Sequence, residues 1–289
     1  MSFFSPLRYP GGKNKLAKFI DKICIDNDTT GHYIEPYAGG ASVALYLLMT
    51  GRVREITIND LDRAIYAFWF SVVNHTDELC RLIETTPITT VEWELHKKTL
   101  ANKDSERDIV SLGFATLFLN RTNFSGVLNG GMIGGRNQTG NYKLDCRFNK
   151  VEIIRKIRKI AEHRDYIHVT NLDAITLIDR VAADDNTIFY FDPPYYIKGP
   201  SLYMNHYKHD DHKAVSDAIK SIPNAKWVVS YDDTEEIHEL YTGQRFINYS
   251  FTHSAGRSRQ GNEAVFFSDN IEIDLNIHPV SLTPMSSAH

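Results

Sequence analysis

The sequence predicts an α/β fold: a Rossmann-like mixed sheet, mostly parallel, with a mostly helical insertion. Three observations predict it. First, residues 187–191 form an apolar, β-prone run that stops at an acid and two prolines, as a buried parallel strand can. Second, strand and helix patterns alternate before residue 75 and again over residues 165–270. Third, residues 76–164 replace this alternation with helical patterns and a glycine-rich loop.

The composition bounds the class of protein. The chain has 289 residues, of which 42% are hydrophobic, so it can bury a substantial core. Cys24, Cys80 and Cys146 form no CxxC pair, which excludes a disulfide framework or a zinc site of the usual spacing. We find no apolar signal core and no apolar run long enough for a membrane, and expect a cytoplasmic protein. The net charge of −4 argues against general nucleic-acid affinity but allows a local basic face.

The stretch Asp192-Pro193-Pro194-Tyr195 ends the strand of residues 187–191. Prolines cannot continue it, because they lack the N–H that a sheet needs. A carboxylate and a tyrosine are therefore left at the carboxyl edge of the sheet, where open α/β sheets bind ligands. A carboxylate beside rigid carbonyls offers several hydrogen-bond acceptors, and the ring offers a stacking face, which suits a flat ring bearing an NH₂ group. The alternative is a strand followed by a plain turn.

The N-terminal region has a glycine turn, Gly11-Gly12, followed by Lys13 and a helical pattern over residues 16–23. This turn presents Tyr9 and Lys13. It lacks the upstream glycine and the Ser/Thr of a phosphate-binding loop, so that interpretation is rejected. A plain helix-entry turn remains the alternative.

Residues 33–45 read as a strand, a glycine turn and a helix. Gly39 and Gly40 allow a ligand to approach the backbone closely. Since the GxGxxG fingerprint is missing, the unit fits a nucleoside without a pyrophosphate better than a dinucleotide. The next strand ends at Asp60, an acid in the position that commonly holds ribose hydroxyls. Alternatively, Asp60 or Asp62 caps the following helix.

The remaining elements follow from hydrophobic periodicity. Helices are expected over residues 61–74, 79–83, 92–100, 108–119, 151–163 and 213–220, and strands over residues 166–170, 226–231, 245–252 and 263–268. The last two strands form a closing antiparallel pair. Either Asp210 or Asp211 is expected to cap the helix that begins at Lys213.

Two loops carry polar and basic residues that suit DNA. Residues 120–141 are crowded with Gly, Asn, Arg and Gln and predict a loop or hairpin able to bond base edges. A flexible glycine loop without a partner is the alternative. The basic residues between 143 and 164 suggest phosphate contact or, more simply, a solvated helix face. Residues 254–262 form a second basic loop, which either meets phosphates or is a solvated turn.

The segment of residues 195–209 is rich in Tyr and His and predicts a mobile lid over the site. His206, His209 and His212 invite a metal interpretation. Their spacing matches no known metal motif, so we expect no metal.

The motifs together resemble a known family. In chain order they are Tyr9 with Gly11-Gly12-Lys13, Glu35-Pro36-Tyr37-Ala38-Gly39-Gly40, Asn59-Asp60, Asn120-Arg121 and Asp192-Pro193-Pro194-Tyr195. This order resembles the Dam-like, D12 class DNA adenine-N6 methyltransferases of the α group. The resemblance implies a class I S-adenosylmethionine-dependent fold. It implies a catalytic domain of residues 1–75 and 165–270, an inserted target-recognition domain of residues 76–164, and a tail of residues 271–289.

The resemblance also implies roles for individual residues. Catalysis is assigned to Asp192, Pro193, Pro194 and Tyr195. Contacts to S-adenosylmethionine are assigned to Tyr9, Lys13, Glu35, Tyr37, Ala38, Gly39, Gly40, Asp60, Asp173 and Asp192. The candidates for DNA contact are Arg121, Asn123, Phe124, Ser125, Asn129, Arg136, Asn137, Gln138, Lys143, Arg257 and Arg259.

Three positions qualify the resemblance. Ala41 stands where many family members have a third glycine. Asn129 stands where members that read GATC tend to carry arginine, so a GATC site is not expected. Phe124 fits the position of the family's aromatic wedge.

The activity expected from the resemblance is transfer of a methyl group to N6 of a flipped adenine in double-stranded DNA. The alternatives are cytosine-N4 or RNA adenine methylation, or a catalytically silent DNA-binding relative. Cytosine-N4 enzymes more often have Ser where this chain has Asp192. A cognate restriction endonuclease is a further candidate partner, and we expect a monomer with no membrane association.

Overall fold

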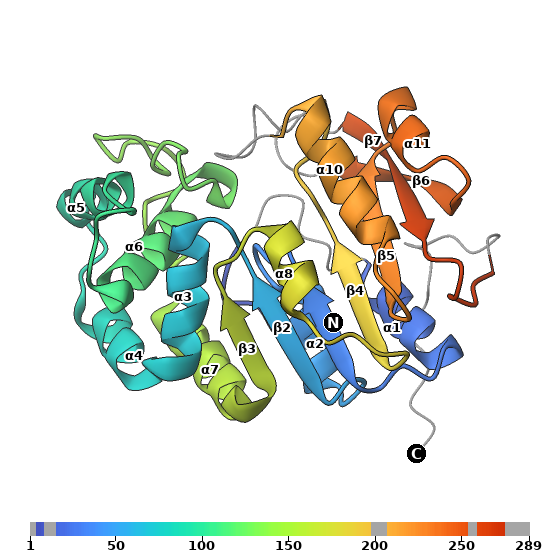
Figure 1. Ribbon diagram of the computed structural model, residues 1–289. Coiled ribbons are helices and arrows are strands. Elements are labelled where there is room, and N and C mark those ends of the chain that lie inside the picture. The colour runs from blue at the N-terminus through green and yellow to red at the C-terminus, as the bar shows by residue number, and fades with distance from the viewer. Residues whose placement is uncertain (1–3, 9–15, 198–206, 254–258, 275–289) are drawn as a thin grey trace, which may run out of the picture.

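A computed structural model describes residues 4–8, 16–197, 207–253 and 259–274; over residues 250–253 and 259–261 only the backbone is described. The described part contains one sheet of seven strands in the order β3-β2-β1-β4-β5-β7-β6 (Figure 1). The strands are β1 (His32–Glu35), β2 (Glu55–Asn59), β3 (Ile167–Thr170), β4 (Thr187–Phe191), β5 (Lys226–Asp232), β6 (Arg245–His253) and β7 (Arg259–Phe267).

The pairing confirms the predicted mixed sheet. Strands β1 to β5 are parallel, whereas β7 runs antiparallel to both β5 and β6. The strand order reverses between β1 and β4, which are hydrogen-bonded neighbours. Open α/β sheets bind ligands outside the carboxyl ends of the strands at such a switch point.

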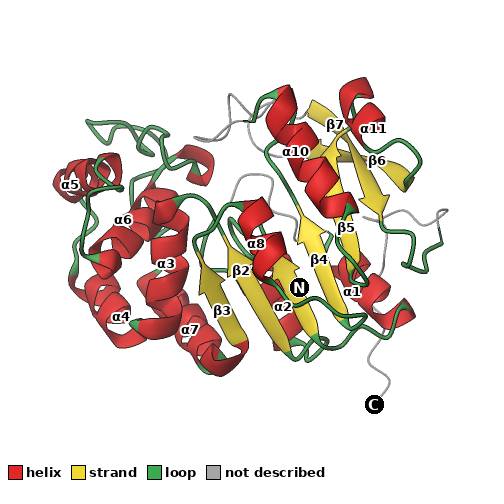
Figure 2. Cartoon of the chain, viewed as in Figure 1, coloured by secondary structure: helices red, strands yellow, loops and turns green. Residues whose placement is uncertain are grey.

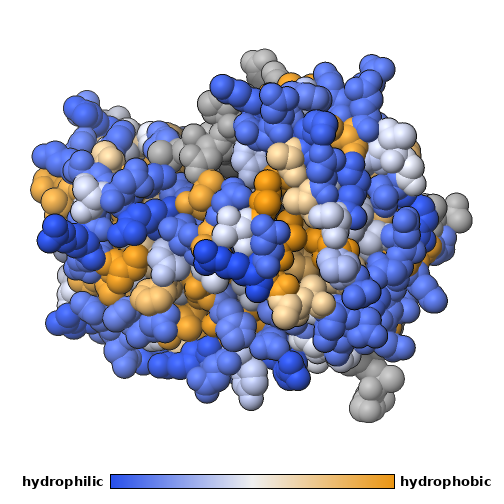
Figure 3. Space-filling model, in the orientation of Figure 1, coloured by the Kyte–Doolittle hydropathy of each residue, from blue (hydrophilic) through white to orange (hydrophobic). Residues whose placement is uncertain are grey.

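Helices cover both faces of the sheet (Figure 2). Alternate strand residues supply the two cores: Tyr190 belongs to the cluster shared with α1 and α2, and Phe189 and Phe191 to the cluster shared with α8, α10 and α11. Figure 3 shows a mostly hydrophilic face on which apolar residues are visible beside α8. The bounds are α1 (Ala17–Asp26), α2 (Ser42–Met49), α8 (Ala174–Arg180), α10 (His209–Lys220) and α11 (Glu235–Leu240).

The predicted insertion is helical, and its helices share the core that contains α1 and α2. Helix α6 packs along α3, and Gly113 is where their backbones approach closely. The domain limits at residues 76 and 164 stay a prediction. The bounds are α3 (Arg63–Asn74), α4 (Thr76–Thr85), α5 (Thr90–Ala101), α6 (Ile109–Thr122), η2 (Phe124–Gly126), α7 (Lys150–Ala161) and η3 (Arg164–Tyr166).

Two helix starts can be compared with the sequence. Asp62 caps α3, accepting a hydrogen bond from the Ala64 N–H at 2.9 Å, as one of the two alternatives expected. Helix α10 begins at His209 rather than Lys213, so Asp210 and Asp211 lie in its first turn and not before it. Asp211 still accepts a hydrogen bond from the Lys208 N–H at 2.8 Å.

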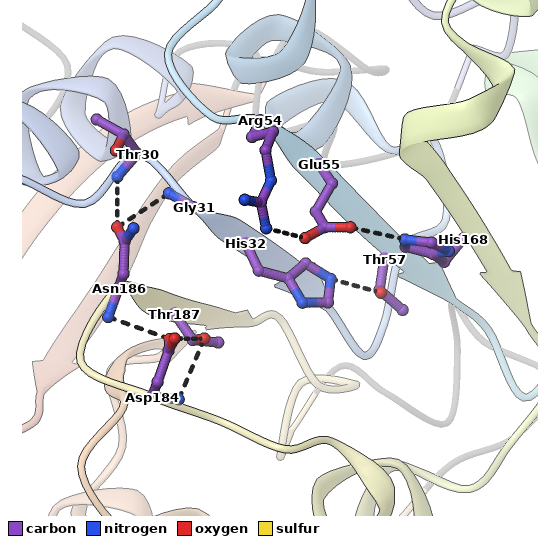
Figure 4. A network of polar contacts seen from close by, with 10 residues as sticks. All are labelled: Thr30, Gly31, His32, Arg54, Glu55, Thr57, His168, Asp184, Asn186 and Thr187. Atoms are coloured by element: carbon purple, nitrogen blue, oxygen red, sulfur yellow. Dashed lines mark hydrogen bonds and ion pairs between the residues drawn. The ribbon is translucent and has the colours of Figure 1, made fainter.

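A polar network ties the amino ends of the strands together, opposite the carboxyl edge of the sheet (Figure 4). The His168 ring bonds the Glu55 carboxylate at 3.0 Å, joining β3 to β2. The His32 ring bonds the Thr57 hydroxyl at 2.7 Å, joining β1 to β2. The Asn186 amide oxygen accepts from two backbone N–H groups before β1. None of the predicted site residues takes part in this network, which has a structural role.

Gly113→Ala should lower the free energy of unfolding by about 1–3 kcal/mol, because an added methyl group would overpack the contact between α3 and α6. It would lie 2.6 Å from the Ala67 carbonyl oxygen and 2.7 Å from the Ser71 hydroxyl. In an open helix the same change normally stabilises by up to about 1 kcal/mol. Urea denaturation measures the difference. Gly131→Ala is the matched control, since a methyl group there meets no heavy atom within 4 Å. A higher midpoint for Gly113→Ala would contradict the packing described.

Candidate functional site

Five acids gather at the carboxyl edge of the parallel strands. Glu35 ends β1 and Asp232 ends β5, while Asp60 and Asp192 follow β2 and β4 directly, and Asp173 precedes α8. Because the carboxyl ends of parallel strands meet at one edge, acids from five separate parts of the chain lie in the same region. Four of these acids were predicted as site residues, and the fifth, Asp232, was not.

The turn after β1 is shaped by two left-handed residues. Gly39 has a φ of +46° and Ala41 a φ of +47°. Glycine adopts such angles without strain, whereas alanine does so at some cost. The backbone conformation therefore explains why a glycine is expected where this chain has Ala41. Ala38 and Gly40 are buried in the same turn, so the predicted cofactor residues of this stretch lie together.

Asp60 holds this turn in place. Its Oδ2 accepts a hydrogen bond from the Gly39 N–H at 2.9 Å, and its Oδ1 accepts one from the Asp62 N–H at 2.9 Å. The Gly39 carbonyl in turn accepts a bond from the Trp69 indole at 2.8 Å. Burial raises the pKa of Asp60 to about 7, against the effect of its two N–H donors. The carboxylate is thus fixed beside the turn rather than used as the helix cap.

Asn59 joins the loops on either side of β2, a role that the sequence analysis did not assign. Its side-chain N–H groups donate to the carbonyls of Pro36 and Leu172, each at 2.9 Å. Its side-chain oxygen accepts from the Leu172 N–H and the Thr170 hydroxyl, each at 2.8 Å. The side chain is buried. It sets the separation of the loops that carry Tyr37 and Asp173.

Glu35 is buried between β1 and α2. Its Oε1 accepts a hydrogen bond from the Tyr33 hydroxyl at 2.9 Å and one from the Ala44 N–H at 3.0 Å. Burial nevertheless raises the pKa of Glu35 to about 8, and the charge of Asp192 acts in the same direction. Because β1 and β4 are paired strands, Glu35 at the end of β1 and Asp192 just after β4 lie at neighbouring strand ends.

Asp192 is oriented by β5. Its Oδ1 accepts a hydrogen bond from the Ser230 hydroxyl at 3.1 Å, and that hydroxyl lies 2.9 Å from the Tyr190 hydroxyl. Tyr195 is buried, with an exposed fraction of 6%, and donates its hydroxyl hydrogen to Glu263. The stretch predicted for catalysis is thus held by hydrogen bonds at its acid and at its tyrosine.

Tyr37 and Tyr207 close one side of this edge. Their hydroxyls share a hydrogen bond at 3.0 Å, and their rings meet edge to face with centroids 6.2 Å apart. Tyr207 thus reaches from the predicted lid to the loop after β1. Residues 198–206, including Tyr203 and His206, lie outside the described residues, as do Tyr9 and Lys13.

The described histidines of the lid region contact aromatic residues. His209 bonds the Tyr196 hydroxyl and His212 the Tyr231 hydroxyl, each at 3.1 Å. Burial lowers the pKa of His212 to about 4. Within the described residues, no group of three or more His, Cys, Asp and Glu residues is arranged to hold a metal ion.

The model of the D12 class N6 adenine-specific DNA methyltransferase family matches residues 9–253. The chain belongs to this family. The Type II methyltransferase M.MjaIII of Methanocaldococcus jannaschii is 24% identical over 202 residues, covering 65% of this chain and 68% of the relative. Among solved structures, an rRNA methyltransferase, aviRa of Streptomyces viridochromogenes, aligns with a TM-score of 0.40 at 10% identity, over 87% of this chain and 82% of that one. The mixed sheet is that of the class I methyltransferase fold.

In this D12 class methyltransferase the predicted hairpin follows α6. One antiparallel bridge joins Asn123 to Met132. The Asn123 side chain is fully buried: its oxygen accepts from the Trp93 indole at 2.6 Å, and its NH₂ group donates to the Val127 and Leu128 carbonyls at 2.9 Å. Asn123, a predicted DNA contact, therefore holds the hairpin together from inside.

Arg121 and Gln138, which were also predicted to contact DNA, form hydrogen bonds to backbone carbonyls of this chain. The Arg121 guanidinium donates to the carbonyls of Pro6 and Arg147, and burial lowers its pKa to about 10. The Gln138 NH₂ group donates to the Ile133 carbonyl at 2.8 Å, within its own loop. Both side chains stabilise the loop structure.

The outer surface of the hairpin carries the other candidates. Phe124 is the most prominent apolar one, with an exposed fraction of 58%. Arg257 lies outside the described residues, and only the backbone of Arg259 is described. The remaining exposed candidates are Ser125, Asn129, Arg136, Asn137 and Lys143.

The basic residues of α7 behave as a solvated helix face. Arg155 and Lys159 pair with acids three residues away, and Lys150 and Lys156 donate to backbone carbonyls. Arg158 pairs with Asp77 of α4. These contacts favour the simpler of the two interpretations for this stretch. In the described part of the chain, no helix is long and apolar enough to cross a membrane.

Glu35→Gln should flatten the pH dependence of stability between about pH 5 and pH 8. The pKa of Glu35 rises from 4.5 to about 8 on folding, so in this range the folded chain keeps a proton that the unfolded chain has released. Stability therefore falls as the pH rises, at up to about 1.4 kcal/mol per pH unit for one proton. Denaturation of the ligand-free protein at several pH values measures the slope, with the exposed Glu239→Gln as control. An unchanged slope in Glu35→Gln would exclude a buried, protonated Glu35.

Proposed function

We propose that this chain transfers a methyl group from S-adenosylmethionine to the N6 amino group of an adenine extruded from double-stranded DNA. The observation that carries the proposal is the pairing of β1 with β4, which brings Glu35 at the end of β1 and Asp192 just after β4 to the same edge of the sheet. One acid belongs to the glycine turn and the other to the stretch expected to hold the base. A cofactor at the first and a base at the second would meet at the switch point of the sheet.

The residues at the glycine turn fit S-adenosylmethionine. Gly39 has no Cβ to obstruct a ligand, and each Asp60 oxygen has a single backbone N–H donor, which leaves acceptor capacity for ribose hydroxyls. Tyr37 offers an aromatic ring beside them. The exposed Asp173 caps α8 through the Ile175 N–H at 2.9 Å, and its second oxygen suits an adenine amino group. We propose Tyr9 and Lys13 at the amino-acid end of the cofactor.

Asp192 and the Pro193 carbonyl are proposed to accept the two N–H bonds of the target amino group. The lone pair of N6 is delocalised into the purine ring, so this nitrogen is a poor nucleophile. Two fixed acceptors pull it toward tetrahedral geometry and localise the lone pair. When bound, the cofactor supplies an electrophilic methyl group, and no covalent intermediate with the protein is needed. Positioning and charge stabilisation then carry the rate.

Tyr195 is proposed to stack on the extruded base. Its hydroxyl is fixed by Glu263, which sets the plane of the ring. Because only 6% of the residue is exposed, the ring has to become uncovered when DNA binds. A base inside a duplex cannot reach this edge, so base flipping follows from the proposal. Phe124 would fill the gap that the base leaves, as intercalating side chains do.

Asp192→Ala should lower the single-turnover rate of methyl transfer by at least about a hundredfold, because one of two acceptors for the amino group is lost. Affinity for S-adenosylmethionine should remain close to that of the wild type. Tritiated methyl transfer and calorimetric cofactor titration measure the two quantities. Asp179→Ala, an exposed change on α8, is the control. Retained turnover in Asp192→Ala would overturn the proposal.

The DNA substrate for this assay must contain the recognition sequence. Sequencing the DNA of an expression host for modified bases identifies that sequence. N6-methyladenine at one sequence supports the proposal and identifies the recognition site. Modification at cytosine N4, or in RNA alone, would assign the alternative acceptors. Absence of any transfer to DNA or RNA by the wild type would assign the catalytically silent relative.

Phe124→Ala should lower the methylation rate of a paired target by about tenfold, because nothing then fills the space that the extruded base leaves. On a substrate with a mismatch at the target base the methylation rate should fall less, since that base is already unstacked. Comparing single-turnover rates on the two substrates measures this difference. Leu95→Ala, an exposed apolar residue on α5, is the control. Equal losses on both substrates would exclude a wedge role for Phe124.

A further inference from the structure

We infer that Asp232 of β5 and Glu263 of β7 are positioning residues for the methyl transfer, which fix the chain immediately after the base-holding Asp192 and Pro193. This inference rests on the proposed function. Neither acid was predicted as a site residue from the sequence, and neither contacts the base or the cofactor in the function proposed above.

Asp232 binds two consecutive backbone N–H groups. Its Oδ1 accepts from the Tyr196 N–H at 2.8 Å, and its Oδ2 accepts from the Ile197 N–H at 3.0 Å. The residue is buried, with an exposed fraction of 8%. Hydrogen bonds to an ionised group are stronger than neutral ones, and two of them fix the direction of the chain as well as its position. Asp232 therefore sets where the chain leaves Tyr195.

Glu263 holds the ring of Tyr195. It is buried, and it accepts hydrogen bonds from the hydroxyls of Tyr195 and Tyr249. Tyr249 lies directly opposite Glu263 on β6. The catalytic stretch and the β6–β7 hairpin are thus joined through one carboxylate.

The two acids lie side by side on neighbouring strands. Asp232 and Glu263 are direct partners in the antiparallel pairing of β5 and β7, which places their side chains on the same face. Like charges in such a position are unfavourable. Donors from the Tyr195–Ile197 stretch offset this cost, two at Asp232 and one at Glu263.

Ser230 completes the arrangement. It lies two residues before Asp232 on β5 and so on the same face, and it donates to Asp192. One face of β5 therefore bonds the catalytic stretch at its first residue, through Ser230, and just after its last residue, through Asp232. The Asp192 carboxylate, the Pro193 carbonyl and the Tyr195 ring are held at fixed separations. Since a displacement of about 1 Å can lower a rate about a hundredfold, loosening one end should affect the chemical step.

The main experiment uses Asp232→Asn. The amide keeps the size of the side chain but has one oxygen for two N–H donors, and it turns an NH₂ group toward one of them. The single-turnover rate of methyl transfer should fall by about tenfold to a hundredfold. The affinity for S-adenosylmethionine should stay unchanged, because the hydrogen bonds of Asp232 go to the backbone of Tyr196 and Ile197 and not to the described residues of the glycine turn.

Asp233→Asn is the matched control. Asp233 is the next residue in the chain, and its carboxylate bonds His238 at 2.7 Å instead of the catalytic stretch. The inference is overturned if Asp232→Asn keeps the wild-type rate, or if both variants lose rate equally. It is also overturned if Asp232→Asn loses cofactor affinity and rate in parallel, which would indicate a general structural role.

A second test does not depend on a change at Asp232. Tyr195→Phe removes only the hydroxyl, and Glu263→Gln keeps the shape of its side chain. If Glu263 acts by holding Tyr195, the loss of rate in the double variant should be smaller than the two single losses combined. Additive losses would overturn the role of Glu263. Substrate carrying 2-aminopurine at the target position reports how the extruded base stacks, and each single variant should change its fluorescence. A wild-type protein without methyl transfer would instead refute the proposed function.

Discussion

Carboxylates buried at the carboxyl edge of the parallel strands are the constraint on which the rest of the site depends. A buried carboxylate needs hydrogen-bond donors, and here the donors include backbone N–H groups of neighbouring segments. Asp60 bonds the turn after β1, Glu35 bonds the first turn of α2, and Asp232 bonds the chain after β4. Each acid thus fixes the position of another segment, and the loops form a connected set.

The fold follows from local patterns to a large extent. Strand β4 begins and ends where its apolar run predicts, because the prolines after Asp192 stop it and its five residues are buried on both faces. The start of α10 was less predictable. Its first turn is polar and carries no hydrophobic periodicity, so the sequence pattern does not show where the helix begins; the bond from the Lys208 N–H to Asp211 lies at this start.

The direction of the side chains in the hairpin cannot be predicted from its composition. Amide side chains bond base edges or their own backbone with equal ease, and Asn123 and Gln138 do the latter. Their direction depends on Trp93 and on loop closure, which are contacts beyond sequence spacing. Asp232 and Glu263 escaped prediction for a related reason. Only the register of β5 against β7 brings them together, and register is a long-range property of a sheet.

Asn120 links the hairpin to a segment 112 residues earlier in the sequence. It is buried at the end of α6 and exchanges hydrogen bonds with the backbone of Arg8, at 2.7 and 2.9 Å. Its NH₂ group also donates to the Gly126 carbonyl at 2.9 Å. A methyl group at Gly126 would lie 2.0 Å from the Arg8 carbonyl oxygen, so only glycine allows this approach. The hairpin that bears Phe124 is therefore fastened to the segment that leads into Tyr9 and Lys13. A displacement of the hairpin would therefore act on the backbone of Arg8 through Asn120 and Gly126.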